Sequence, residues 1–149
     1  FKEVNDRHGH AVGDAVLRAI ADRLQEITRE GDLAARVGGD EFVILCQGVT
    51  DSEVLATLAE RIIDSIDRPI TAGDAVVKVG ISIGIAVATG REVDGDRLLI
   101  VSDQAMYRAK ATGGNHARVP ARPPAVAGSD GRPQHDRARK RCASCHRKS

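Results

Sequence analysis

The chain has no long apolar run. None of its 149 residues belongs to a stretch that approaches the roughly 18 apolar residues of a membrane span, and no signal peptide is visible. Its hydrophobic content of 42% is still enough to bury a core, so we expect one soluble globular domain. The chain starts at Phe1, inside a patterned segment. We therefore interpret it as part of a longer cytoplasmic protein, whose membrane anchor, where one exists, precedes this residue.

Cysteine and methionine are scarce. The three cysteines give no disulfide framework and fit a reducing cytoplasm. Cys46 lies in an apolar strand pattern and is expected to pack as a small hydrophobe. Residues 142–146, CASCH, match the pattern of covalent haem attachment, but Met106 is the only methionine and no folded context surrounds the motif. Neither haem nor a zinc pair is the preferred interpretation.

Charge is distributed unevenly, although the formal net charge is only +1. The segment from Pro120 onward contains eight Lys or Arg and two Asp. The residues before it contain 14 basic and 19 acidic side chains. Residues 119–149 have little apolar content, so we expect a disordered basic tail that follows a folded domain at 1–118. A solvated tail is preferred over one that contacts nucleic acid or anionic lipid, and no specific nucleic-acid partner is expected.

Apolar periodicity predicts the first elements. Residues 14–29 have helical spacing, and residues 33–37 and 42–46 read as the strands of a hairpin with a Gly-Gly turn. The sequence Thr50-Asp51-Ser52-Glu53 has the pattern of a capping box and starts a second helix that ends before Pro69. The residues expected to be buried are Val16, Ile20, Leu24 and Ile27 in the first helix and Val54, Leu58, Ile62 and Ile66 in the second.

The second half of the domain adds a strand and a helix. Residues 79–87 alternate bulky and small side chains, which predicts a strand. Its small face lets a helix or a ligand approach the backbone, and close helix packing is the commoner reason. Residues 96–112 predict a third helix. The order helix, hairpin, helix, strand, helix indicates an α+β fold in which helices cover one side of a mostly antiparallel sheet.

The predicted hairpin turn carries adjacent carboxylates, Asp40 and Glu41, directly after Gly38 and Gly39. Neighbouring carboxylates repel each other unless a cation lies near them, and a divalent metal would supply that cation. Glycines without a Cβ also let backbone N–H groups reach a phosphate. From these residues alone, a metal and phosphate site and an exposed acidic turn are equally good interpretations.

A second polar cluster occupies residues 1–14, FKEVNDRHGHAVGD, which we expect to form a loop before the first helix. Together with RVGGDEF at 36–42 and SDQAMYRAKATGGN at 102–115, it resembles the GGDEF family of diguanylate cyclases, whose pattern includes FK-x-x-ND-x-x-GH-x-x-GD. The resemblance covers residues 1–118, and these motifs in this order are highly specific. It implies the palm-like fold of nucleotide cyclases and polymerases. The implied reaction joins two GTP into cyclic di-GMP in a homodimer, with Mg²⁺ or Mn²⁺ as cofactor and loss of pyrophosphate.

The resemblance also implies roles for the hairpin residues. Asp40 would bind metal and accept the proton of the 3′-hydroxyl, and Glu41 would assist at the metal. Gly38 and Gly39 would bring backbone close to the phosphates. Lys2 would stabilise charge on the phosphoryl oxygens during transfer.

By the same resemblance, Asn5 and Asp14 would recognise guanine. A carboxylate accepts from guanine N1–H and the 2-amino group at once, whereas adenine offers neither donor, so Asp14 would select GTP. Asp14 also suits a helix N-cap, and both roles are compatible. His10 would lie near the nucleotide or act as a structural loop histidine. Lys110 would reach phosphate or act as a cation at a helix C-terminus.

Arg29 and Asp32 match the R-x-x-D site at which the family binds its product, five residues before Gly38. Arg29 would bind phosphate or guanine through its forked guanidinium, and Asp32 would accept from a guanine edge. An exposed Arg and Asp at a helix end are also common without any ligand. Feedback inhibition by cyclic di-GMP is the hypothesis that follows.

The chain departs from the family pattern at two places. The strand carrying Asp-x-Asp, which family members have before Phe-Lys, does not precede Phe1, so we expect the isolated chain to be inactive and marginally stable. Gly114 stands where family members usually have an arginine. An upstream sensory domain is expected. The alternative function is a non-catalytic module that binds GTP or cyclic di-GMP. The enzyme is favoured by the joint presence of Asp40, Glu41, Lys2, Asn5 and Asp14.

Overall fold

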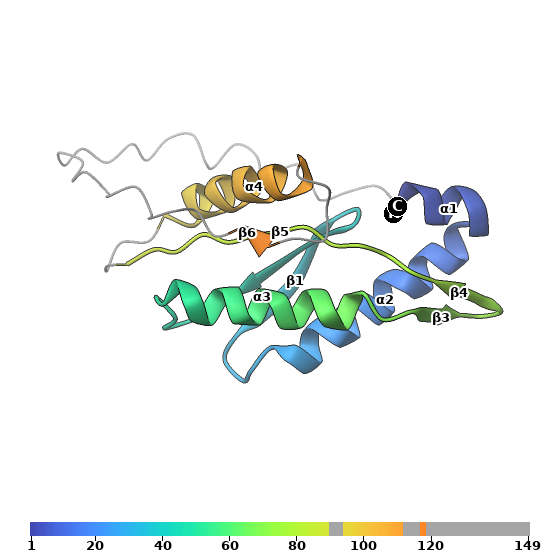
Figure 1. Ribbon diagram of the computed structural model, residues 1–149, viewed down its shortest axis with the longest axis horizontal. Coiled ribbons are helices and arrows are strands. Elements are labelled where there is room, and N and C mark those ends of the chain that lie inside the picture. Colours follow the sequence, from blue (N-terminus) through green and yellow to red (C-terminus); the bar gives the residue numbers. More distant parts are fainter. Residues whose placement is uncertain (90–93, 112–116, 119–149) are drawn as a thin grey trace, which may run out of the picture.

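The computed structural model describes residues 1–89, 94–111 and 117–118. The predicted tail at 119–149, the CASCH motif and Gly114 lie outside these residues. The described chain is an α+β fold, as predicted (Figure 1). Its helices are α1 (Lys2–His8), α2 (His10–Ile27), α3 (Ser52–Ile66) and α4 (Gly95–Ala111). Its strands are β1 (Leu33–Gly38), β2 (Glu41–Leu45), β3 (Ile70–Ala72), β4 (Ala75–Val77), β5 (Ile83–Gly84) and β6 (Ala117–Arg118).

The segment before residue 14 is helical, so the expected loop is wrong. Gly9, with φ of 84°, separates α1 from α2, a backbone conformation that glycine adopts without steric cost. Its N–H donates to Asn5 O at 2.8 Å and closes α1. The N-cap role of Asp14 is also wrong, because Asp14 lies inside α2 and Gly9 occupies the N-cap position.

The predicted hairpin is confirmed. β1 and β2 pair antiparallel, with Leu33 opposite Leu45 and Arg36 opposite Phe42. The register shifts between Arg36 and Gly38, which is the signature of a bulge, and Gly39 turns with φ of 48°. β1 packs against α2. The acidic turn therefore lies at the end of a hairpin that runs alongside the rest of the domain (Figure 1).

The predicted second helix is confirmed as α3, but its N-cap is not Thr50, the residue at which a capping box places it. Asp51 occupies the N-cap, and its side chain accepts a hydrogen bond from Glu53 N at 2.8 Å. Ile62 and Ile66 are buried as predicted, whereas Val54 is 53% exposed. The buried stripe of α3 lies nearer its C-terminal half, where it faces α2.

The core forms between α1, α2, α3 and the short hairpin of β3 and β4, which sequence periodicity did not predict. Val16, Leu24 and Ile66 are the largest fully buried side chains. Removing such side chains from water stabilises a fold by roughly 1.5–3 kcal/mol each. The buried cluster comprises Val4, Val16, Ile20, Leu24, Ile62, Ile66, Ile70, Ala72 and Val77.

The predicted strand at 79–87 forms a ladder only at Ile83–Gly84, which pairs parallel with Ala117–Arg118. Within the described residues the strands form three separate two-stranded sheets. Alternation of bulky and small side chains predicts which way each side chain faces, but backbone hydrogen bonds to a neighbouring strand are also needed to form a sheet. The close helix approach predicted for the small face is confirmed. A Cβ built on Gly84 would overlap Ser102 O and Met106 N and lie 2.9 Å from Met106 Cβ, so α4 rests directly on β5.

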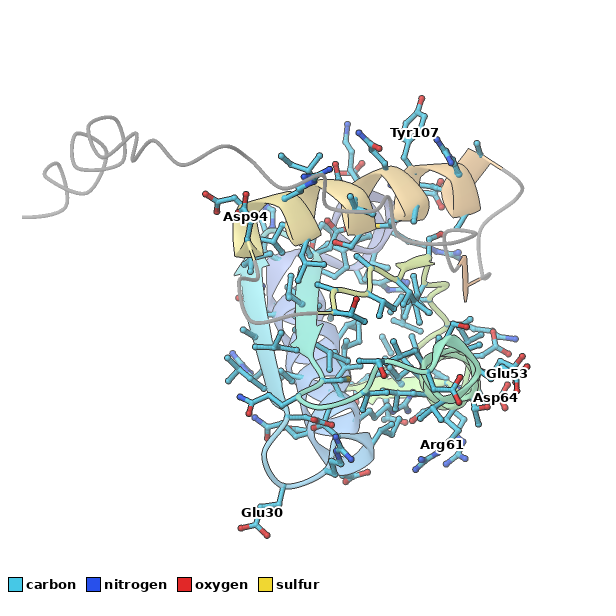
Figure 2. All side chains as sticks on the ribbon, turned by 90° about the vertical axis from the view of Figure 1, so that its left-hand side faces the viewer. Glu30, Glu53, Arg61, Asp64, Asp94 and Tyr107 are labelled. Atoms are coloured by element: carbon cyan, nitrogen blue, oxygen red, sulfur yellow. The ribbon has the colours of Figure 1, made fainter. Side chains whose placement is uncertain are left out.

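α4 buries small residues against this segment. Ala105 and Ala109 are 4% and 0% exposed, while Tyr107 points away from the body (Figure 2). No helix in the described ranges is both long enough and apolar enough to cross a membrane.

Candidate functional site

Asp40 and Glu41 lie at the end of the β1–β2 hairpin. Asp40 occupies the turn and Glu41 is the first residue of β2, and both are exposed. Within the described part of the chain, no hydrogen bond or ion pair engages either carboxylate. The turn is held instead by Arg36, whose Nε donates to Gly39 O at 2.9 Å. Both carboxylates are therefore available to a ligand.

The packing of α1 on α2 places Asn5 against Gly13, the residue before Asp14. A Cβ built on Gly13 would overlap Asn5 Oδ1 and lie 3.0 Å from Asn5 Cγ and 3.3 Å from Phe1 Cζ. Asn5 thus lies directly across the backbone of α2, at the residue before Asp14. Gly13 is needed because any larger side chain would occupy the place of the Asn5 amide.

A groove of about 440 Å³ is lined by α2 and the hairpin. Asp14, Arg18 and Gln25 line its α2 side, and Arg36 and Phe42 line its hairpin side. This volume lies in the range of roughly 300–1,000 Å³ for small-molecule sites. One cavity therefore borders both a predicted guanine-recognising residue and the Arg36–Phe42 pair, the last regular pair of the hairpin before the Gly-Gly-Asp-Glu turn.

The remaining predicted substrate residues lie at element ends. Lys2 is the first residue of α1, His10 is the first of α2 and Lys110 is in the last turn of α4. All three are exposed. Among the residues that the structure describes, no hydrogen bond or ion pair joins them to the hairpin turn. Their roles toward phosphate remain predictions.

The two carboxylates are ligands of the type that a divalent cation prefers, but they fill only part of its coordination shell. Mg²⁺ prefers carboxylate and phosphate oxygens, which Asp40 and Glu41 match. Within residues 1–89, 94–111 and 117–118, however, no three Asp, Glu, His or Cys side chains gather as a metal site. Further ligands would have to be water, nucleotide phosphates or groups outside the described residues.

Arg29 and Asp32 bind each other and the end of β2. Arg29 Nε lies 3.3 Å from Asp32 Oδ1, and Arg29 Nη2 donates to Gln47 O at 2.6 Å. Gln47 N–H donates to the same Asp32 oxygen at 3.3 Å. The side chain of Arg29 is 59% exposed and that of Asp32 only 4%. A ligand would therefore meet Arg29 first.

Cys46 lies beside this pair and is half-buried. Burial raises the pKa of its thiol, the negative charge of Asp32 raises it further, and Arg29 partly offsets the rise. The thiol is therefore neutral at physiological pH, in keeping with its predicted role as a small packed side chain.

Sequence reasoning missed Arg36. The residue reads as one position of a strand, and nothing in its spacing shows that its side chain turns back to a carbonyl three residues later. A long cationic side chain just before a glycine pair is a signal that could have found it.

Comparisons with known proteins agree on one family. A family model described as diguanylate cyclase, GGDEF domain, matches residues 1–116. The chain is 43% identical over 111 residues to the diguanylate cyclase TpbB of Pseudomonas aeruginosa, covering 74% of this chain and 26% of that protein. It is 41% identical over 115 residues to the bifunctional diguanylate cyclase/cyclic di-GMP phosphodiesterase MucR of the same species, covering 77% and 17%. The chain thus spans about a quarter or less of these relatives.

Solved structures show the same similarity. The crystal structure of the GGDEF domain of YfiN, also named TpbB, from Pseudomonas aeruginosa has a TM-score of 0.75 at 40% identity, over 79% of this chain and 74% of that one. The coiled coil and GGDEF domain of DgcB from Caulobacter crescentus, solved in complex with c-di-GMP, has a TM-score of 0.62 at 26% identity, over 79% and 63%.

Proposed function

The chain belongs to the diguanylate cyclase GGDEF-domain family, and we propose that it is the domain with which a larger protein condenses two GTP molecules into cyclic di-GMP. One observation carries the proposal. The groove beside α2 is lined by Asp14 on one side and by Arg36 and Phe42 on the other, so a base held by Asp14 lies in a cavity that reaches the last regular pair of the hairpin before the acidic turn.

Base recognition falls to Asn5 and Asp14. The Asp14 carboxylate accepts hydrogen bonds from guanine N1–H and the 2-amino group, and the adjacent Asn5 amide supplies a further donor or acceptor. Adenine has no hydrogen at N1 and no 2-amino group, so ATP would leave the carboxylate unpaired. Sites built to pair with a polar group reject ligands that lack it by large factors.

The transfer step takes place at the hairpin turn. The 3′-oxygen of one GTP attacks the α-phosphorus of the other, a new P–O bond forms, and the bond from the α-phosphorus to the bridging oxygen breaks. The leaving group is pyrophosphate, and the 3′-hydroxyl proton passes to the Asp40 carboxylate. The same attack by the 3′-oxygen of the second nucleotide on the α-phosphorus of the first closes the ring and releases a second pyrophosphate. Lys2 and Lys110 stabilise negative charge on the phosphoryl oxygens. Mg²⁺ or Mn²⁺, held in part by Asp40 and Glu41, would neutralise charge on the triphosphate when bound.

Full-length protein tests the proposal directly. We expect it to convert GTP, but not ATP, into cyclic di-GMP and pyrophosphate when Mg²⁺ is present. Asp40→Asn should abolish turnover and weaken the Mg²⁺-dependent part of GTP binding, measured by calorimetry. Asp14→Asn should reduce the preference for GTP over ATP.

The alternative, a module that binds GTP or cyclic di-GMP without turnover, has its own signature in this experiment. It predicts Asp14-dependent nucleotide binding with no pyrophosphate release under any metal condition. Absence of guanine-nucleotide binding would overturn both functions.

The 149-residue chain alone is a different case. Because no three metal-ligating side chains gather within the described residues, metal would rest on Asp40, Glu41, water and the nucleotide alone, and we propose that residues 1–149 by themselves release no measurable pyrophosphate from GTP. Turnover by the purified chain would contradict this.

A further inference from the structure

The side chain of Arg36 closes the hairpin turn. Arg36 lies in β1 opposite Phe42, immediately before the register shift, and its Nε donates to Gly39 O at 2.9 Å. The Nη atoms of this guanidinium have no hydrogen-bond partner among the described residues. The bond spans three residues, from the last regularly paired position of β1 to the turn itself.

This hydrogen bond fixes more than one atom. In a trans peptide the C=O and the following N–H point in opposite directions. Holding Gly39 O toward Arg36 therefore aims Asp40 N–H away from Arg36 and fixes the plane from which the Asp40 side chain leaves the backbone. Gly39, with φ of 48°, has no Cβ to restrict it, so the turn has other accessible conformations once the bond is lost.

We propose that Arg36 is a positioning residue of the cyclase reaction, which orients the Gly39–Asp40 peptide so that the Asp40 carboxylate and amide face the triphosphate. The inference rests on the proposed function and adds to it a residue that touches neither metal nor phosphate. The competing role is direct contact with the nucleotide, because Arg36 lines the groove and a guanidinium fork can donate to guanine O6 and N7.

The experiment compares Arg36→Ala and Arg36→Lys with Arg61→Ala in the full-length protein. Arg61 is a matched control because it is an exposed arginine on α3 that points away from the body (Figure 2). We expect Arg36→Ala to lower kcat by about 10- to 100-fold, since small misplacements of a catalytic group have effects of this size. KM for GTP and the affinity for guanosine should change by less than about threefold. Arg36→Lys keeps a donor and should recover part of kcat.

A structural readout accompanies the kinetics. Hydrogen exchange followed by mass spectrometry should be faster in the peptide that contains residues 38–42 in Arg36→Ala and unchanged in Arg61→Ala. Thermal unfolding shows whether each variant folds. If Arg36→Ala does not fold, Arg36→Lys replaces it in both measurements.

Two results would overturn the inference. One is a kcat of Arg36→Ala within about twofold of the control, because a positioning role requires a larger effect. The other is a parallel loss of guanosine affinity, which would assign Arg36 to the base. Failure of the proposed function has a different result: the unsubstituted protein itself would make no cyclic di-GMP. That result would overturn both the proposed function and the role of Arg36.

Discussion

Gly13 is the single residue on which the base-recognition cluster depends. Asn5 and Phe1 occupy the space that a Cβ would take, and Asn5 Oδ1 is the group it would displace. We expect Gly13→Ala to weaken GTP binding by about tenfold, which corresponds to roughly 1.4 kcal/mol, the size of one lost hydrogen bond. Stability should hold, because alanine favours the helix by roughly 0.5–1 kcal/mol and only a side-chain end must move.

Calorimetry and thermal unfolding of the same protein separate these effects. Gly95→Ala is the control, because Gly95 is also in a helix and a Cβ built on it has no atom within 4 Å. Unchanged GTP affinity in Gly13→Ala would show that Asn5 does not help to bind the base.

The rate at which Cys46 is alkylated should depend on pH. The pKa of Cys46 is raised by burial and by Asp32, so the reactive thiolate is scarce at pH 8. We expect slow alkylation of Cys46 that accelerates as pH rises through the elevated pKa. Asp32→Asn should lower the pKa and speed the reaction, and Arg29→Ala should slow it. Any stability that the neutral thiol contributes is present at neutral pH and lost as pH rises through the folded-state pKa.

The measurement is peptide mass spectrometry after timed alkylation, in a background with Cys142→Ser and Cys145→Ser. Alkylation of Cys46 at pH 8 as fast as that of the same protein unfolded in urea would contradict the prediction.

At the scale of elements, Arg23 joins α2 to the end of α3. Its Nη1 donates to Ser65 O at 2.7 Å and Arg68 O at 2.8 Å, and its Nη2 donates to Pro69 O at 2.9 Å. The last carbonyls of a helix have no partner within it, so this guanidinium caps α3 while holding it on α2. We expect Arg23→Ala to lower the free energy of unfolding by about 2 kcal/mol, discounted for partial exposure.

Urea unfolding checks this value. Arg61→Ala removes the same charge from the exposed face of α3 and should change stability by less than about 0.5 kcal/mol. Equal effects of the two substitutions would show that the carbonyl contacts contribute nothing.

Periodicity predicted the longer elements and missed the short ones. α2, α3 and α4 each span several turns, so their apolar stripes are visible in the sequence. β3 and β4 have three residues each, too few to show alternation, although Gly73-Asp74 between two short runs rich in β-branched residues is a turn signal. α1 contains one buried residue, Val4, and its polar side chains resembled a loop.

Those parts of the candidate site that depend on residue type alone could be predicted. The order Gly38, Gly39, Asp40 and Glu41 was enough to predict two adjacent carboxylates at a hairpin turn. The contact of Asn5 with Gly13 and the bond from Arg36 to Gly39 could not be predicted, because both depend on how a side chain folds back across backbone.

At the scale of the whole molecule, the proposed product site connects α2 to the hairpin. Arg29 and Asp32 hold Gln47 at the far end of β2 from the acidic turn. We expect Arg29→Ala, in the full-length protein, to raise the inhibition constant for cyclic di-GMP at least about tenfold, because a charge-assisted contact is lost. Glu30→Ala is the control, since Glu30 projects from the same loop into solvent (Figure 2). Unchanged product inhibition in Arg29→Ala would remove this site from regulation.

The proposed reaction also bears on assembly. We propose that each chain supplies one GTP, so that two chains with their hairpin turns facing each other are needed for one turnover. We expect the specific activity of the full-length protein to rise with protein concentration and to level off once dimers saturate. Sedimentation at the same concentrations should place the dimerisation midpoint where activity is half-maximal. Full specific activity at concentrations where only monomer sediments would show that one chain can bind both GTP molecules.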